Sequence, residues 1–130
     1  MTRDLKRILY VEDDEDIAEM AVMALEALGN FEVTHCSSGQ AAISAYAKAS
    51  PQLVIMDVMM PEMDGLETIG RLKAIHGMST APFIYMTARA QQHEKMAYLE
   101  TGALDVIVKP FDPMTLCEKI FIIWEQNDAA

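Results

Sequence analysis

The sequence has few basic residues, few cysteines and no long hydrophobic run. Its ten lysines and arginines are outnumbered by twenty aspartates and glutamates, for a formal net charge of −10. Proteins that bind nucleic acid neutralise its phosphates with a basic face, so this balance argues against direct nucleic-acid binding. The longest apolar runs have the length of a strand, which excludes a membrane-spanning helix. Cys36 and Cys117 lack the spacing of metal ligands, which predicts reduced thiols in a cytoplasmic protein.

What is present is enough apolar material for one folded domain. Hydrophobic residues make up 52% of the 130 residues, which excludes a disordered chain. The segment before Ile8 is too short and too charged for a secretory signal. No linker, repeat or low-complexity stretch interrupts the sequence, so we expect a single domain over residues 1–130 with no output domain.

Four apolar runs of strand length each end in a polar side chain. They are residues 8–11 before Glu12, 53–56 before Asp57, 83–86 before Thr87 and 106–108 before Lys109. Uninterrupted runs of this kind are typical of strands buried on both faces of a parallel sheet. Residues 31–36 alternate instead, as in an edge strand. Helical periodicity follows each strand, and five strands alternating with five helices predict a flavodoxin-like, doubly wound α/β fold with strand order 2-1-3-4-5.

The helical segments have predicted inner faces and caps. The predicted inward-facing residues are Ile17, Met20, Ala21, Ala24, Leu25 and Leu28 in the first helix, Met96 and Leu99 in the fourth, and Leu116, Ile120 and Ile123 in the last. Ser37 with Gln40 is predicted to cap the second helix, and Asp112 with Pro113 to open the last. The last helix has a second apolar line of Cys117, Phe121, Ile122 and Trp124. This line is either deep packing or a surface for a partner.

In the predicted strand order, the carboxyl ends of the first and third strands meet at the topological switch point, where ligands bind. Glu12, Asp13 and Asp57 would then share one crevice, and three carboxylates repel one another unless a cation lies among them. Oxygen ligands of this kind suit Mg²⁺. With the cation bound, Asp57 can act as a nucleophile toward a phosphoryl group. Lys109 and Thr87 on neighbouring strand ends would balance the charge of that group.

Some of these polar residues also have plainer interpretations. Asp14, Glu15 and Asp16 lie in the first turn of a helix, where acidic residues favour the macrodipole and cap the backbone. A hydroxyl such as that of Thr87 at a strand end can simply bond to the backbone. The three histidines, His35, His76 and His93, are scattered and form no cluster.

The four strand-end motifs together resemble those of the receiver domain of two-component response regulators. In chain order they are Val11-Glu12-Asp13-Asp14, Asp57-Val58-Met59-Met60-Pro61-Glu62-Met63-Asp64-Gly65, Met86-Thr87-Ala88 and Val108-Lys109-Pro110-Phe111. Each motif alone is weak, whereas all four in order at strand ends are highly specific. The resemblance extends over essentially the whole chain.

The resemblance implies that Asp57 is the phosphoacceptor, Thr87 the switch hydroxyl and Lys109 the cation that binds the phosphoryl group. It also implies a cis peptide bond before Pro110. One position departs from the family pattern. Receivers commonly carry Tyr or Phe three residues before the lysine, and this chain has Val106, so the aromatic half of the usual switch is missing.

The resemblance further implies a metal site and a set of partners. Glu12, Asp13, Asp57 and the backbone carbonyl of Met59 would hold Mg²⁺. The phosphodonor would be a sensor histidine kinase or a histidine phosphotransfer protein. The output would be a downstream protein bound through the face of the fourth helix, fifth strand and fifth helix. We expect a monomer or a weak phosphorylation-dependent dimer, no membrane partner, and no enzymatic activity beyond self-phosphorylation and autodephosphorylation.

Three other functions remain to be weighed. A phosphatase of the haloacid dehalogenase type would need a second aspartate two residues after Asp57, where Met59 lies. A flavodoxin-type binder would need a Gly-rich or hydroxyl-rich phosphate loop after the first strand, where this chain has acids. A pseudo-receiver that only binds partners would not need the intact Asp57, Thr87 and Lys109. The sequence does not separate a stand-alone receiver from a piece of a longer protein.

Overall fold

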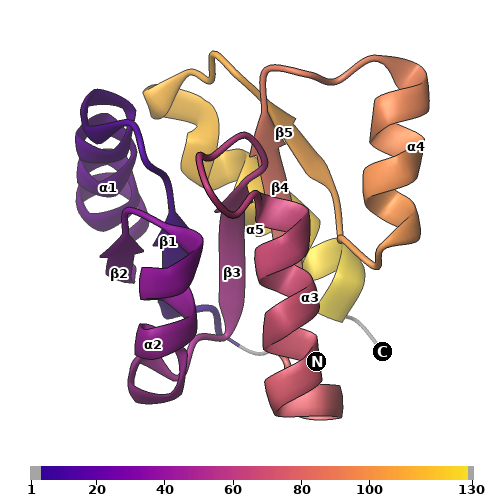
Figure 1. Ribbon diagram of the computed structural model, residues 1–130. Helices are drawn as coiled ribbons and strands as arrows, with labels where there is room; N and C mark the ends of the chain where they lie inside the picture. Colours follow the sequence, from indigo (N-terminus) through magenta and orange to yellow (C-terminus); the bar gives the residue numbers. More distant parts are fainter. Residues whose placement is uncertain (1–3, 129–130) are drawn as a thin grey trace.

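The computed structural model describes residues 4–128 of the chain as a five-stranded sheet covered by helices (Figure 1). The elements are β1 (Arg7–Val11), α1 (Glu15–Gly29), β2 (Glu32–Cys36), α2 (Gly39–Ala49), β3 (Leu53–Asp57), α3 (Gly65–His76), the 3₁₀ turn η1 (Gly77–Ser79), β4 (Phe83–Thr87), α4 (Gln92–Glu100), β5 (Val106–Val108) and α5 (Pro113–Asp128). All strand pairs are parallel, and the order is β2-β1-β3-β4-β5. The predicted fold class and strand order are confirmed.

The sheet separates two hydrophobic cores. One core lies between the sheet and the helices α1 and α5, and the other between the sheet and α2, α3 and α4 (Figure 1). β3 and β4 are buried along their whole length, as their uninterrupted apolar runs predict. β2 lies at the edge and is only partly buried, in agreement with its alternating sequence.

Helix caps fix where the chain leaves each strand end. The Asp14 carboxylate accepts from the backbone N–H groups of Asp16 and Ile17 and so begins α1, the capping role expected of this residue. Asp112 accepts from the N–H of Met114 at the start of α5. The predicted cap of α2 was wrong by one residue, because Ser38 and not Ser37 accepts from the N–H of Ala41.

The predicted inner faces were correct for α5, partly wrong for α1 and wrong for α4. Leu116, Ile120 and Ile123 are buried, whereas Met20 and Leu28 of α1 lie on the surface and Ala18 is buried instead. In α4, Met96 and Leu99 are exposed, and Tyr98 is the residue that packs inward. Apolar residues at helical spacing show that a helix has an inner face, but they do not fix the rotation of the helix about its axis and therefore which residues face the sheet.

The second apolar line of α5 divides between core and surface. Cys117 and Trp124 are buried, whereas Phe121 and Ile122 are 39% and 50% exposed. Both cysteines are free and buried, and burial raises the pKa of each thiol. None of the helices in the described part of the chain is long and apolar enough to cross a membrane.

Candidate functional site

The carboxyl ends of β1 and β3 bring three acidic side chains together. The two strands pair in register up to Val11 and Met56, so the residues that follow, Glu12 and Asp57, emerge side by side. Carboxylate oxygens of Glu12, Asp13 and Asp57 all lie within 4.8 Å of one another. Glu12 and Asp57 are nearly inaccessible, at 1% and 2% exposure. The sequence prediction that these three acids share a crevice at the switch point agrees with this geometry.

Lys109 joins the three acids from β5. Its Nζ lies 3.1 Å from Asp57 Oδ1, to which it donates a hydrogen bond, and 2.5 Å from Glu12 Oε1. The Lys109–Pro110 peptide bond is cis. Burial alone would lower the pKa of Lys109, but the adjacent carboxylates of Glu12 and Asp57 outweigh it and raise that pKa. One ammonium is thus shared by two buried carboxylates.

The site is short of positive charge. Burial, followed by the nearby Glu12 carboxylate, raises the pKa of Asp57 to about 7, although Lys109 opposes the shift. A carboxyl in this state takes up a proton or needs a further cation. Three clustered oxygen donors, two of them removed from water, suit a hard divalent ion such as Mg²⁺. The residues present therefore fit the metal that the sequence predicts.

Thr87 follows at the end of β4, beside β5. Its side chain is fully buried, and its hydroxyl accepts a hydrogen bond from the backbone N–H of Arg89 at 3.0 Å. The backbone N–H of Lys109 donates to the Thr87 carbonyl oxygen, which ties the two strand ends together. In this structure the hydroxyl therefore has the local backbone bond that its plainer interpretation predicts, and its role as a switch stays a prediction.

The loop after Asp57 passes close to that residue. The N–H of Gly65 donates to the carbonyl oxygen of Val58 at 2.9 Å, and a Cβ at Gly65 would collide with the Asp57 carbonyl oxygen. Only glycine fits this approach, so Gly65 shapes the rim of the site. The side chain of Met59 in the same loop is 55% exposed. Metal binding through its carbonyl stays a prediction.

Tyrosines from other elements lie where the family's switch aromatic is missing. Val106 packs in the core cluster that also holds Tyr85 and Tyr98. The rings of these two tyrosines are 5.6 Å apart, and the hydroxyl of Tyr85 accepts a hydrogen bond from the Thr101 side chain at 3.2 Å. The aromatic residue at this position of the core thus comes from α4 and not from β5.

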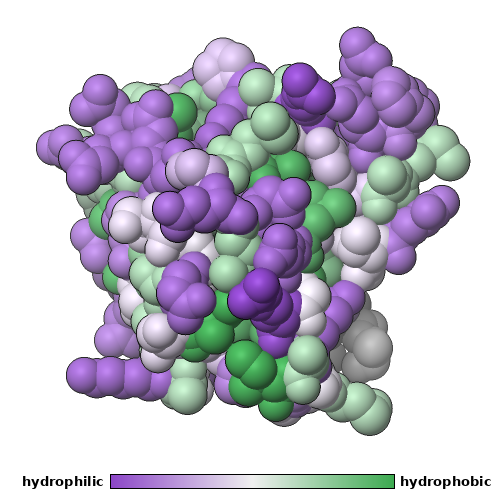
Figure 2. Space-filling model, viewed as in Figure 1, coloured by the Kyte–Doolittle hydropathy of each residue, from purple (hydrophilic) through white to green (hydrophobic). Residues whose placement is uncertain are grey.

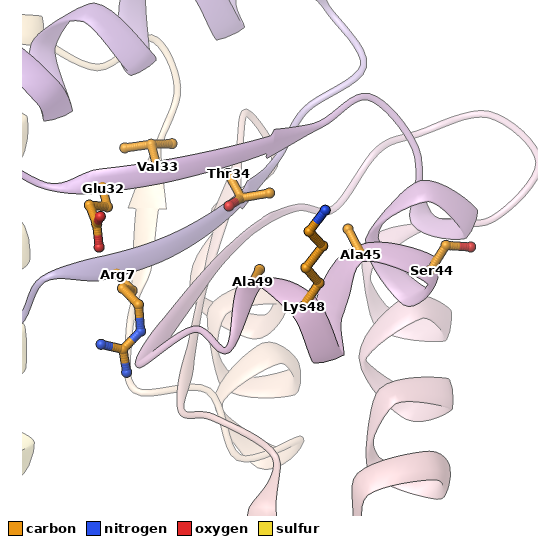
Figure 3. Close-up of a pocket in the computed structure, with 8 residues that line it drawn as sticks. All are labelled: Arg7, Glu32, Val33, Thr34, Ser44, Ala45, Lys48 and Ala49. Carbon is orange, nitrogen blue, oxygen red and sulfur yellow. The ribbon is translucent and has the colours of Figure 1, made fainter.

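A cavity of about 680 Å³ lies away from the acids, between β2 and α2 (Figure 3). Arg7 and Lys48 line it together with Glu32. The Arg7 guanidinium is used structurally, because its Nε donates to the carbonyl oxygen of Ser50 after α2. This cavity is an open groove at the sheet edge, and the chemistry is concentrated at Asp57.

Comparison with known proteins gives one consistent result. A model of the family described as "Response regulator receiver domain" matches residues 8–121. The chain is 38% identical over 109 residues to an uncharacterized 14.6 kDa protein encoded in the sodA1 3' region of Leptolyngbya boryana, covering 84% of this chain and 82% of that protein. It is 34% identical over 123 residues to the DNA-binding response regulator MtrA of Mycobacterium tuberculosis, covering 95% of this chain and 52% of that protein.

A solved structure agrees with these matches. The chemotaxis response regulator CheY4 of Vibrio cholerae superposes with a TM-score of 0.82 at 28% identity, covering 92% of this chain and 99% of the other. The chain thus spans nearly the full length of that protein and about half the length of MtrA. The rest of MtrA lies outside the match.

Proposed function

Because the chain belongs to the response regulator receiver family, we propose that it is a phosphorylation-dependent signalling domain acting in the cytoplasm. Asp57 would accept a phosphoryl group from a phosphohistidine of a sensor kinase or a phosphotransfer protein. The observation that carries this proposal is the convergence of Asp57, Glu12, Asp13 and Lys109 at one edge of the sheet.

The chain's own residues supply most of what the reaction needs. An oxygen of the Asp57 carboxylate would form a bond to phosphorus as the phosphorus–nitrogen bond to the donor histidine breaks, and the imidazole leaves with the electron pair of that bond. Mg²⁺, held by Glu12, Asp13 and Asp57, would neutralise charge on the transferred group. Lys109 already lies 3.1 Å from Asp57 and would bind the same group. The buried position of Asp57 limits access of water.

We propose no turnover of an external substrate. A haloacid dehalogenase type of phosphatase needs an acid two residues after the nucleophile, and Met59 offers none. The only chemistry would be phosphorylation of Asp57 and its later hydrolysis. Multiple-turnover release of inorganic phosphate from excess phosphomonoester that is lost in Asp57→Ala would contradict this.

Mass spectrometry tests the phosphoacceptor. The full chain is incubated with Mg²⁺ and acetyl phosphate, and we expect a mass increase of one phosphoryl group that maps to Asp57 and is labile to hydroxylamine. Chelation of Mg²⁺ should abolish the labelling. Asp57→Ala serves as the negative control, and unchanged labelling of this variant at another residue would refute the assignment.

The output would be a protein contact on the face of α4, β5 and α5. On this face Val108 and Ile122 are 42% and 50% exposed and lie beside a groove of about 300 Å³ between β5 and α5. The aromatic residues of the second apolar line of α5 do not lie exposed on this face, because Trp124 is buried and Phe121 lies on the α1 side, 5.1 Å from the ring of Phe31. Apolar anchors of an interface on this face would be aliphatic.

Hydrogen exchange tests this choice of face. We expect beryllofluoride, which stands in for the phosphoryl group, to change protection in α4, β5 and the start of α5 in the presence of Mg²⁺. Changes confined to α1 and α2 would contradict it. The acidic net charge argues against nucleic acid as a partner of these residues. If the chain forms a weak dimer, sedimentation should detect it only after phosphorylation.

A further inference from the structure

Two buried polar atoms next to the acidic site have no hydrogen bond. Among the described residues, the side-chain atoms Tyr10 Oη and Glu12 Oε1 are both buried and lack a partner with hydrogen-bond geometry. Buried donors and acceptors are nearly always paired, because an unpaired group loses its water without compensation. Glu12 Oε1 has the Lys109 ammonium beside it, whereas the Tyr10 hydroxyl is a buried donor left over next to the site, which points to a second state of the site in which it is used.

The position of Tyr10 directs its side chain to the floor of the site. Side chains two apart on an extended chain lie on the same face, and Glu12 directly follows β1 with its N–H still donating to the carbonyl oxygen of Cys36 at the end of β2, so Tyr10 lies below Glu12. The side chain is completely buried. Burial raises the pKa of Tyr10, and the charges of Glu12 and Asp57 and a side-chain interaction with Glu12 add to this shift, so the hydroxyl lies close to these carboxylates.

The charged neighbour of Glu12 in the structure is Lys109. Glu12 Oε1 lies 2.5 Å from Lys109 Nζ, an ion-pair contact without hydrogen-bond geometry, and Glu12 Oε2 accepts from the N–H of Asp14 at 3.3 Å. The same Lys109 ammonium also serves Asp57. If Lys109 moves toward a phosphoryl group on Asp57, Glu12 loses this contact and stays buried at 1% exposure.

We propose that Tyr10 is a positioning residue whose hydroxyl donates to the Glu12 carboxylate when the three acids hold a divalent cation. The inference rests on the proposed function, because it assumes the cation. The hydroxyl would hold Glu12 in the orientation that binds the ion and replace the contact that Lys109 gives up. It touches neither the phosphoryl group nor the donor, and acts through Glu12 alone.

The alternative is that Tyr10 is ordinary core filling with an unused hydroxyl. The two possibilities differ in what Tyr10→Phe does, because this change removes one oxygen and keeps the ring. A hydroxyl without a bond in the metal-free protein adds nothing to its stability, so its removal should leave the melting temperature equal or higher. If the hydroxyl bonds to Glu12 in the metal-bound state, its removal should weaken metal binding.

The experiment measures metal binding on the full chain, apart from phosphorylation. Calorimetry with MgCl₂ gives the affinity, and thermal unfolding in chelator and in saturating Mg²⁺ gives the stabilisation by the metal. For Tyr10→Phe we expect unchanged or higher stability in chelator, an affinity for Mg²⁺ about tenfold weaker and a smaller rise in melting temperature on adding Mg²⁺.

Tyr85→Phe is the matched control. Tyr85 is also completely buried, but its hydroxyl already has a partner in Thr101. Its loss should lower the stability in chelator and leave the affinity for Mg²⁺ unchanged. If Tyr10→Phe keeps the wild-type affinity, or loses stability in chelator as Tyr85→Phe does, the inference is wrong. If the wild-type chain itself neither binds Mg²⁺ nor is labelled by acetyl phosphate, the proposed function fails instead.

Discussion

The helices α1 and α4 both follow strands that deliver a site residue, yet they are attached to the sheet very differently. α1 has 15 residues, buries Ala18, Ala21, Ala24 and Leu25, and begins at Asp14, whose carboxylate accepts two backbone N–H groups. α4 has nine residues, all within the described part of the chain, and buries Tyr98 alone. Hydrophilic side chains cover the upper part of α4 in the space-filling view (Figure 2).

Because of this difference, the site residues at the ends of β1 and β4 are held with different firmness. The acids at the end of β1 precede a helix that is anchored in a core, so their positions are held firmly. Thr87 at the end of β4 precedes a helix with little buried apolar surface, which can open or shift at a small free-energy cost. A phosphoryl group supplies only a few new contacts, and only a weakly attached element responds to so little energy. The contrast supports a switch that moves the α4 side.

The largest expected effect is loss of a core side chain in α1. Leu25 is fully buried, so Leu25→Ala should lower the free energy of unfolding by about 2–5 kcal/mol. Chemical denaturation measures the change. Leu28→Ala in the same helix is the control, because Leu28 is 52% exposed and its loss should change stability by less than about 0.5 kcal/mol. Equal effects of the two variants would show that α1 is not anchored as described.

The second prediction concerns the carboxylate at the end of β3, which meets the acids that precede α1. Because the pKa of Asp57 is raised from 3.8 to about 7, the folded metal-free protein binds more protons than the unfolded chain between these values. Stability in chelator should therefore fall as the pH rises from about 4 to 7, by an amount on the order of a few kcal/mol. Asp57→Asn should remove this part of the pH dependence.

Denaturation of both proteins at pH 5 and pH 8 measures the difference. Carboxylates away from the site contribute equally to the two proteins, so the wild type should lose stability relative to Asp57→Asn at the higher pH. A constant difference between the two proteins would mean that Asp57 is ionised at both pH values. The unfavourable charge would then lie elsewhere in the site.

The two helices also differ in how well the sequence predicts their packing. The sheet order and the convergence of Glu12, Asp13, Asp57 and Lys109 follow from apolar runs that end in polar residues, because parallel strands place such residues at one edge. α1 was recognisable from its long periodic stripe, although Met20 and Leu28 turned out to be exposed. The signal was strong wherever many residues shared one pattern.

The sequence did not predict which face of α4 packs inward, nor that Tyr10 lies beneath the acids. The apolar residues of α4, Met96, Tyr98 and Leu99, are too few to define a face, and the structure shows that Tyr98 is the one that packs inward, 5.6 Å from the ring of Tyr85. Tyr10 reads as one more apolar member of a buried strand. A period of two from Glu12 would have placed it under the acids, but only coordinates indicate that its hydroxyl lacks a bond.

Removing the one anchor of α4 should have a smaller global effect than Leu25→Ala. Tyr98→Ala should lower the free energy of unfolding by about 1–2 kcal/mol, because the short helix can detach in place of leaving a cavity. Amide exchange should speed up in α4 and stay unchanged in α1. Leu99→Ala, at a site that is 44% exposed, is the control. Protection lost across the whole sheet would contradict the weak attachment of α4.

The smallest effect should come from improving the cap of α4. Gln91 is the N-cap of the helix, and its backbone N–H donates to the Glu94 carboxylate at 3.1 Å, which is one half of a capping box. Glutamine is not a favoured N-cap, whereas serine would keep this bond and accept from the backbone N–H groups of the first turn with a shorter side chain. Gln91→Ser should stabilise α4 by about 0.5–1 kcal/mol, seen as slower amide exchange within that helix, with almost no change in the melting temperature of the protein. The matched change is Asp14→Ala, which removes the cap of α1 and should lower the global stability by about 1 kcal/mol. The two results differ because α1 unfolds only with the sheet, whereas α4 opens on its own. If the Gln91 variant raised the melting temperature as much as Asp14→Ala lowered it, α4 would be as firmly integrated as α1, and the proposed switch would need another moving element.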